Sequence, residues 1–125
     1  MQYVLNIYNY GSMSDIEIQW LGTAAFKITY QNFTVLLDPW VTRNPHSTPK
    51  CKTNPEALAE GANLILVSHG HFDHIADIPR ILRKNKEVEV WGPPVSMNTL
   101  RRLCRDEVSR IHDTLGGVIA RPGMK

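Results

Sequence analysis

Ser68-His69-Gly70-His71-Phe72-Asp73-His74 is the stretch that decides how this sequence is interpreted. It holds three of the five histidines of the chain and directly follows the wholly apolar run 64–67. A short apolar run of this kind is typical of a strand that is buried on both faces. Because the end of a buried strand is a rigid platform, and the loops beyond such strands hold the sites of α/β folds, this stretch is the candidate functional site.

The spacing within the stretch is that of metal ligands. His69 and His71 are two residues apart, so an extended backbone points both imidazoles to the same side. Two converging imidazoles suit zinc, with Zn–N bonds of ~2.0–2.1 Å, and Gly70 between them adds no bulk. Asp73 and His74 can face a second cation, and two ions ~3.5–4 Å apart would make a bridging hydroxide at neutral pH. The alternative, a polar loop with local hydrogen bonds, is disfavoured by this spacing after an apolar strand.

The surrounding pattern predicts an α/β fold with a mixed sheet and helices packed on it. Apolar and polar residues alternate over 16–20, and residues 25–30 and 33–37 also have strand patterns, so the chain opens as a meander. Helices then alternate with strands. We expect helices over 55–60, 77–84 and 96–105, with Asn54, Asp77 and Ser96 as caps, and strands over 64–67, 88–91, 108–112 and from 118.

Length and composition indicate one ordinary globular domain. The chain has 125 residues, 42% of them hydrophobic, and a formal net charge of +2, too near balance to indicate nucleic acid or a charged membrane surface. No apolar run reaches the ~18 residues of a membrane span, and no secretory signal opens the chain. Cys51 and Cys104 form no CxxC pair, which excludes a structural zinc knot and favours reduced thiols. We therefore expect a cytoplasmic protein.

The histidine stretch also resembles a known motif. Residues 68–74 are similar to the metal-binding motif of the metallo-β-lactamase fold superfamily. Two further segments resemble its UlaG-like branch of predicted metal-dependent hydrolases, namely Trp20-Leu21-Gly22-Thr23-Ala24-Ala25-Phe26-Lys27-Ile28 and Val35-Leu36-Leu37-Asp38-Pro39-Trp40. The resemblance covers roughly residues 16 to 120. Thr23 departs from the branch, which often has a histidine there, so no role is carried over to it.

The resemblance implies a ligand set. His69 and His71 would bind a first metal, and Asp73 and His74 a second, with Asp73 also the catalytic residue that steers the proton of the hydroxide. Asp38 would orient the metal loop from behind by hydrogen bonds, although a plain turn before Pro39 is an equal alternative. Zn2+ is the expected ion, with up to two bound, and Mn2+ or Fe2+ are alternatives.

The resemblance also implies that part of the fold is missing. The family fold is an αββα sandwich of two similar halves, and its second half supplies further histidine and aspartate ligands. We expect residues 15–125 to be a truncated first half, and 1–14 to be an appendage rather than the alternative extra strand. The remaining histidines, His46 and His112, lie in no ligand-spaced pair and are expected to be ordinary surface or turn residues.

These observations predict a metal-dependent hydrolase of an ester, lactone or phosphodiester, present as an incomplete chain. The alternatives are a half-domain completed by homodimerisation and a metal-binding remnant without turnover. The partner would be a small-molecule substrate, with no nucleic acid and no membrane, since acids accompany the basic clusters at 80–86 and 101–105. Trp20, Trp40 and Trp91 are expected in the core, with Trp40 alternatively lining the site.

Overall fold

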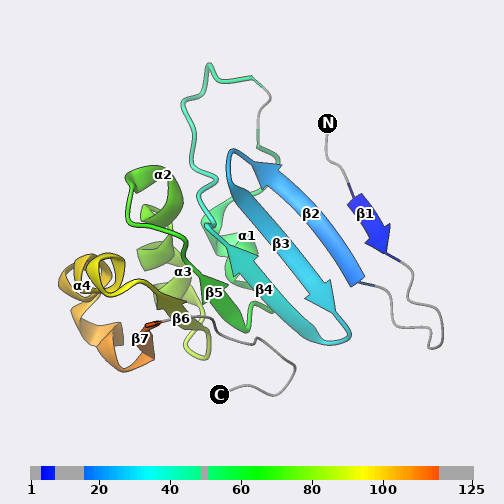
Figure 1. The fold of residues 1–125 in the computed structure, drawn as a ribbon. Coiled ribbons are helices and arrows are strands. Elements are labelled where there is room, and N and C mark those ends of the chain that lie inside the picture. Colours follow the sequence, from blue (N-terminus) through cyan, green and yellow to red (C-terminus); the bar gives the residue numbers. More distant parts are fainter. Residues whose placement is uncertain (1–3, 8–15, 49–50, 116–125) are drawn as a thin grey trace.

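Within the part of the chain that the structure describes, seven strands form a single mixed sheet whose spatial order is the order of the sequence (Figure 1). The computed structural model describes residues 4–7, 16–48 and 51–115. The strands are β1 (Val4–Ile7), β2 (Ile16–Gly22), β3 (Ala25–Tyr30), β4 (Phe33–Leu37), β5 (Leu64–Leu66), β6 (Glu89–Gly92) and β7 (Ile111–Asp113). The helices are α1 (Pro55–Ala59), α2 (Phe72–Ile75), α3 (Ile78–Lys84), α4 (Pro94–Leu103) and the 3-10 helix η1 (Arg105–Arg110).

The sheet changes direction of pairing once. Strands β1 to β4 pair antiparallel, as a meander, and β4 to β7 pair parallel with helical connections. The β3–β4 hairpin turns at Gln31, which takes a φ of 54°. The α1 connection begins with Asn54, whose side chain accepts a 2.8 Å hydrogen bond from the Ala57 backbone. The predicted α/β fold with a mixed sheet is therefore confirmed, and its parallel strand ends gather at one edge.

The two faces of the sheet are covered unequally. One face carries Leu36, Ile65 and Val90, each with no exposed surface, and helices α3 and α4 pack their own buried residues against it. The opposite face holds Leu64, which is buried, and a set of apolar side chains that are all partly exposed. That set comprises Ile16, Ile18, Trp20, Phe26, Ile28, Tyr30, Phe33, Val35, Leu37, Leu66 and Trp91. We call it the open sheet face.

Two element boundaries and the core tryptophans differ from the expectation. Helix α4 begins at Pro94, after Pro93, rather than after Ser96. Most of the predicted strand 108–112 is the helix η1, because the Arg110 guanidinium donates to the backbone carbonyls of Leu82, Asn85 and Val88. Those bonds hold 105–110 away from the ladder. Strand β7 accordingly starts only at Ile111, and the tryptophans expected in the core are partly exposed.

The N-terminal segment contains a strand. Strand β1 lies within the expected appendage 1–14 and pairs antiparallel with β2, as the extra-strand alternative required. The domain boundary at residue 15 stays a prediction, and the strand expected from 118 lies outside the described residues. Within the ranges that the structure describes, no helix is both long and apolar enough to cross a membrane.

Candidate functional site

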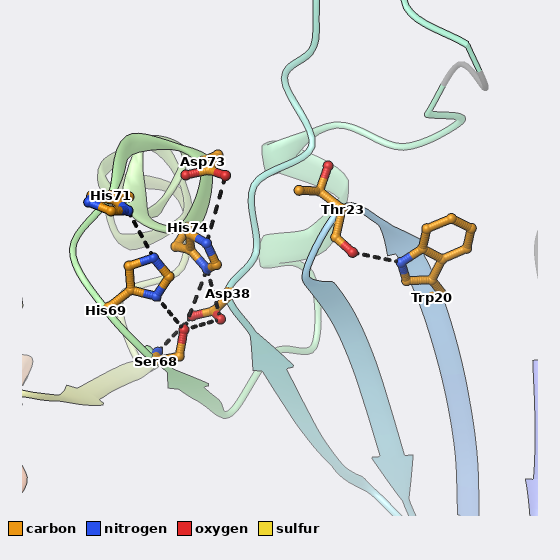
Figure 2. A network of polar contacts seen from close by, with 8 residues as sticks. All are labelled: Trp20, Thr23, Asp38, Ser68, His69, His71, Asp73 and His74. Atoms are coloured by element: carbon orange, nitrogen blue, oxygen red, sulfur yellow. Dashed lines mark hydrogen bonds and ion pairs between the residues drawn. The ribbon is translucent and has the colours of Figure 1, made fainter.

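The histidine stretch lies at the carboxyl ends of two parallel strands. It connects β5 to α2, while Asp38 directly follows the neighbouring strand β4. The parallel register pairs Leu37 with Leu66, and the Asp38 backbone N–H donates to the Leu66 carbonyl at 3.0 Å. This pairing brings Asp38 against the loop, as Figure 2 shows.

Asp38 is the buried anchor of the loop. Its side chain accepts from the Ser68 backbone N–H at 2.7 Å and from the Ser68 hydroxyl at 2.5 Å, and it lies 2.9 Å from His74 Nδ1. Only 4% of Asp38 is exposed. Its φ of 42° is a left-handed conformation that aspartate tolerates better than most residues. The left-handed backbone conformation of Asp38 therefore directs its carboxylate toward the histidine stretch.

This carboxylate sets the tautomers of two histidines. A serine hydroxyl has one hydrogen, and that of Ser68 points to Asp38. The Ser68 oxygen can then accept from His69 Nδ1 at 3.0 Å, which in the neutral ring places the lone pair of His69 on Nε2. His74 Nδ1 lies 2.9 Å from Asp38 and can donate to it, which in the neutral ring places its lone pair on Nε2 as well. These assignments follow from the hydrogen-bond network, and they leave Nε2 of each ring directed away from Asp38.

The four expected ligands form two pairs. His69 Nε2 lies 3.1 Å from His71 Nδ1, and both residues are exposed. His74 Nε2 lies 3.7 Å from Asp73 Oδ2, with side-chain exposures of 12% and 34%. The rings of His69 and His74 are 3.8 Å apart between centroids, so the two pairs are neighbours (Figure 2).

The chemistry of each donor pair fits a divalent ion, although each pair supplies only two ligands. Two nitrogens at opposite ends of one tetrahedral edge around zinc would be about 3.3 Å apart, given bonds of ~2.0–2.1 Å. The His69–His71 separation of 3.1 Å is close to that value, but the two nitrogens share a hydrogen bond, so one of them must lose its proton before both can bind an ion. However, among the residues that the structure describes, no three His, Cys, Asp or Glu side chains converge as one metal-holding group. The described part of the chain therefore supplies pairs of ligands rather than a closed site.

The other polar candidates lie apart from this set. His46 is exposed in the 41–48 loop, where its backbone N–H donates to the Asn44 side chain. His112 stacks on Trp91 in the parallel part of the sheet, and its Nε2 lies 3.3 Å from Glu89. Thr23 uses its backbone carbonyl to accept from Trp20 Nε1 at 3.0 Å (Figure 2).

Two supporting residues make contacts that the sequence did not predict. Ser68 lies in the histidine stretch, but its link between Asp38 and His69 depends on a contact across 30 positions. Asp77 precedes α3 but makes no cap bond with its side chain. Instead its carboxylate, 3% exposed, accepts from the backbone N–H groups of Val41 and Thr42 at 2.7 and 2.8 Å. No local sequence signal could have indicated either contact.

The cysteines do not contribute a nucleophile to this site. Cys51 and Cys104 are both free thiols, as expected. Burial, reinforced by the nearby Glu107 carboxylate, raises the pKa of the Cys104 thiol to about 11. Cys104 is therefore a neutral thiol at physiological pH, and thiolate chemistry is not available from it.

Comparisons with known proteins agree with this geometry. A family model described as the beta-lactamase superfamily domain matches residues 34–122. A UPF0173 metal-dependent hydrolase of Polynucleobacter asymbioticus is 34% identical over 119 residues, which are 92% of this chain and 41% of the relative. A UPF0173 metal-dependent hydrolase of Roseobacter denitrificans is 40% identical over 77 residues, 62% of this chain and 32% of the relative. The chain thus spans less than half the length of these curated relatives.

A solved structure shares the fold at low sequence identity. The apo state of the chemotaxis sensor ODP from T. denticola matches with a TM-score of 0.58 at 15% identity. The match covers 98% of this chain and 50% of that one. At this identity the likeness concerns the architecture alone.

Proposed function

The chain belongs to the beta-lactamase superfamily, and from that premise we propose that it carries the metal-binding half of a hydrolase for an ester, lactone or phosphodiester bond. The observation that supports this proposal is the geometry of the loop. Two donor pairs lie side by side at the carboxyl end of β5, and the buried Asp38 carboxylate contacts His74 directly and reaches His69 through the Ser68 hydroxyl. Such a platform at a strand end is where an α/β fold places its chemistry.

Each donor pair would hold one divalent ion. His69 and His71 would bind the first, and Asp73 and His74 the second, with Zn2+ the ion that best suits mixed imidazole and carboxylate donors and Mn2+ or Fe2+ as alternatives. With an ion bound by these residues, the site would gain polarisation of the bond to be cleaved and a strong nucleophile at neutral pH.

The protein's own residues would organise the reaction. Asp38 and Ser68 keep Nε2 of His69 and His74 unprotonated and directed outwards, so these rings need no rearrangement to bind. Asp73 is one-third exposed beside His74, where its carboxylate can hold the proton released from the attacking water. Asp73 is therefore the proposed catalytic residue.

The proposal includes a source for the remaining ligands. Catalytic zinc takes three protein ligands, whereas each pair here supplies two. The relatives carry more than half of their length outside the matched part. We propose that a second half adds the missing donors in the fully active enzyme, and that this half-domain alone turns over substrate only weakly.

The open sheet face favours a second candidate, in which two copies of the chain complete each other. Soluble monomers rarely leave so many apolar side chains partly exposed on one surface. A two-fold dimer would cover each face with the other copy's. In sedimentation over a concentration series, Ile28→Glu on the open face should shift dimer to monomer, and Lys27→Glu on the opposite face should not. A monomer at every concentration would contradict this candidate.

The experiment that tests the function is zinc-dependent turnover by the full chain. The protein would be loaded with zinc and assayed with p-nitrophenyl acetate and bis(p-nitrophenyl) phosphate, before and after chelation. We expect turnover that chelation removes, that zinc restores and that Asp73→Asn lowers by about 100-fold, the lower end of a general acid–base contribution. Bound zinc without turnover of either compound would instead support a non-catalytic metal-binding remnant.

A further inference from the structure

An exposed aromatic residue lies within the histidine stretch, between two of the candidate ligands in the sequence. Phe72 is the first residue of α2, between His71 and Asp73, and 70% of it is exposed. Neither the helix start nor the donor pairs require a large apolar side chain at this position. Phe72 is therefore available to contact whatever approaches the ligands.

A second aromatic ring meets it from the neighbouring strand end. Trp40 lies two residues beyond Asp38, and its ring centroid is 5.6 Å from that of Phe72, at an interplanar angle of 84°. This edge-to-face arrangement is a preferred one for aromatic pairs. Because Trp40 is itself partly exposed, the pair presents open aromatic surface instead of a buried contact.

The backbone that carries Trp40 is held firmly. The Trp40 N–H donates to the Asp38 carbonyl at 2.7 Å, and the next two N–H groups, of Val41 and Thr42, donate to the buried Asp77 carboxylate. Trp40 is thus fixed to the same anchor as the metal loop. A site built on such fixed elements can discriminate by shape, since its walls do not move away from a poor fit.

We propose that Trp40 and Phe72 form an aromatic wall beside the ligands, which favours substrates with a flat apolar ring next to the bond that is cleaved. The inference rests on the proposed function and narrows its substrate class. An aromatic ring of the substrate would pack against Phe72 while the polar group to be attacked lies at the donor pairs. Most ligand sites combine an apolar lining with a few fixed polar groups in this way.

The test compares two phosphonates that differ only in the ring. Phenylphosphonate and methylphosphonate would be titrated by calorimetry into the zinc-loaded full chain, with zinc per chain measured in the same samples. We expect the phenyl compound to bind about two- to tenfold more tightly, the range of a specific aromatic contact. Phe72→Ala should bring this ratio close to one, and Phe72→Tyr, which retains the ring, should preserve it.

Controls separate this inference from the function on which it rests. Leu103→Ala removes another exposed apolar side chain, on α4, and should leave the ratio unchanged. If zinc binds but the ratio is near one, is unchanged in Phe72→Ala, or neither phosphonate binds, the aromatic wall is refuted while the metal site stands. If no zinc binds, the proposed function fails and this inference fails with it.

Discussion

The two donor pairs of one loop differ in how they are held. His74 is 12% exposed at its side chain, and its Nδ1 contacts a buried carboxylate. His69 and His71 are exposed, and they are held by each other and by the Ser68 hydroxyl. One end of the loop is therefore fixed by a buried contact, whereas the other is held by exposed contacts alone. If the loop binds metal as proposed, buried support and not the motif alone determines which of its side chains are preorganised.

The largest expected effect comes from removing the charge of the anchor. Asp38→Asn keeps a residue that tolerates the positive φ, but it replaces an acceptor that serves Ser68 and His74 by one that cannot satisfy all their donors. We expect a loss of about 2 kcal/mol in the free energy of unfolding and of about 10–100-fold in zinc affinity. Urea denaturation and zinc titration measure the two.

Asp73→Asn is the matched control for the predicted change in the free energy of unfolding. Its carboxylate is partly exposed and its contact with His74 is 3.7 Å long, so the free energy of unfolding should change by less than about 0.5 kcal/mol. Equal destabilisation by the two variants would remove the distinction between a buried and an open end of the loop.

A smaller difference is expected between the histidines themselves in metal-free protein. His74→Ala leaves the Asp38 carboxylate without one of its donors and should cost about 1–2 kcal/mol in the free energy of unfolding. His71→Ala removes an exposed ring and should stay within about 0.5 kcal/mol. The midpoints of urea denaturation, measured with a chelator present, compare them directly. A larger loss of unfolding free energy in His71→Ala than in His74→Ala would contradict the assignment of His74 to the better supported end of the loop.

The smallest effect is expected from removing the Ser68 hydroxyl, which links Asp38 to His69. Ser68→Ala removes the hydroxyl that accepts from His69 Nδ1, so the His69 ring should become a mixture of tautomers. Nitrogen chemical shifts of the imidazole at a pH where it is neutral would show this, while the free energy of unfolding falls by about 1 kcal/mol or less. Ser47→Ala, which removes an exposed hydroxyl bonded to the Asn44 carbonyl, should leave the His69 signals unchanged. Identical tautomer populations in Ser68→Ala and the native chain would contradict the proposed link.

Local pattern predicted much of this architecture. Alternation over 16–20 and the strand patterns of 25–30 and 33–37 predicted the meander, and the short apolar runs between helices predicted the later strands, because strand period is a local property. The prediction of a strand over 108–110 was wrong since three carbonyls distant in sequence hold Arg110. The tryptophans were expected in the core because an apolar pattern indicates which face is apolar but not what covers it.

The candidate site could be predicted from the sequence to a similar extent. The four expected ligands lie within six consecutive positions, so their spacing alone brought them together, and the structure places them as two adjacent pairs. The contacts of Asp77 and Ser68 could not be predicted because their partners lie some thirty positions away in the chain. The pairing of Trp40 with Phe72 likewise joins two strand ends that only the parallel register of β4 and β5 makes neighbours.

The measurement that tests the central claim most directly is zinc bound per chain, determined by elemental analysis of tag-free protein. Three proteins would be compared: the native chain, His71→Ala and His46→Ala, which removes an exposed histidine outside the loop. We predict at least one zinc per chain in the native protein and in His46→Ala, and a clearly lower ratio in His71→Ala, which keeps only the Asp73–His74 pair. No zinc in any of the three, or equal zinc in all of them, would contradict a metal site in the histidine loop.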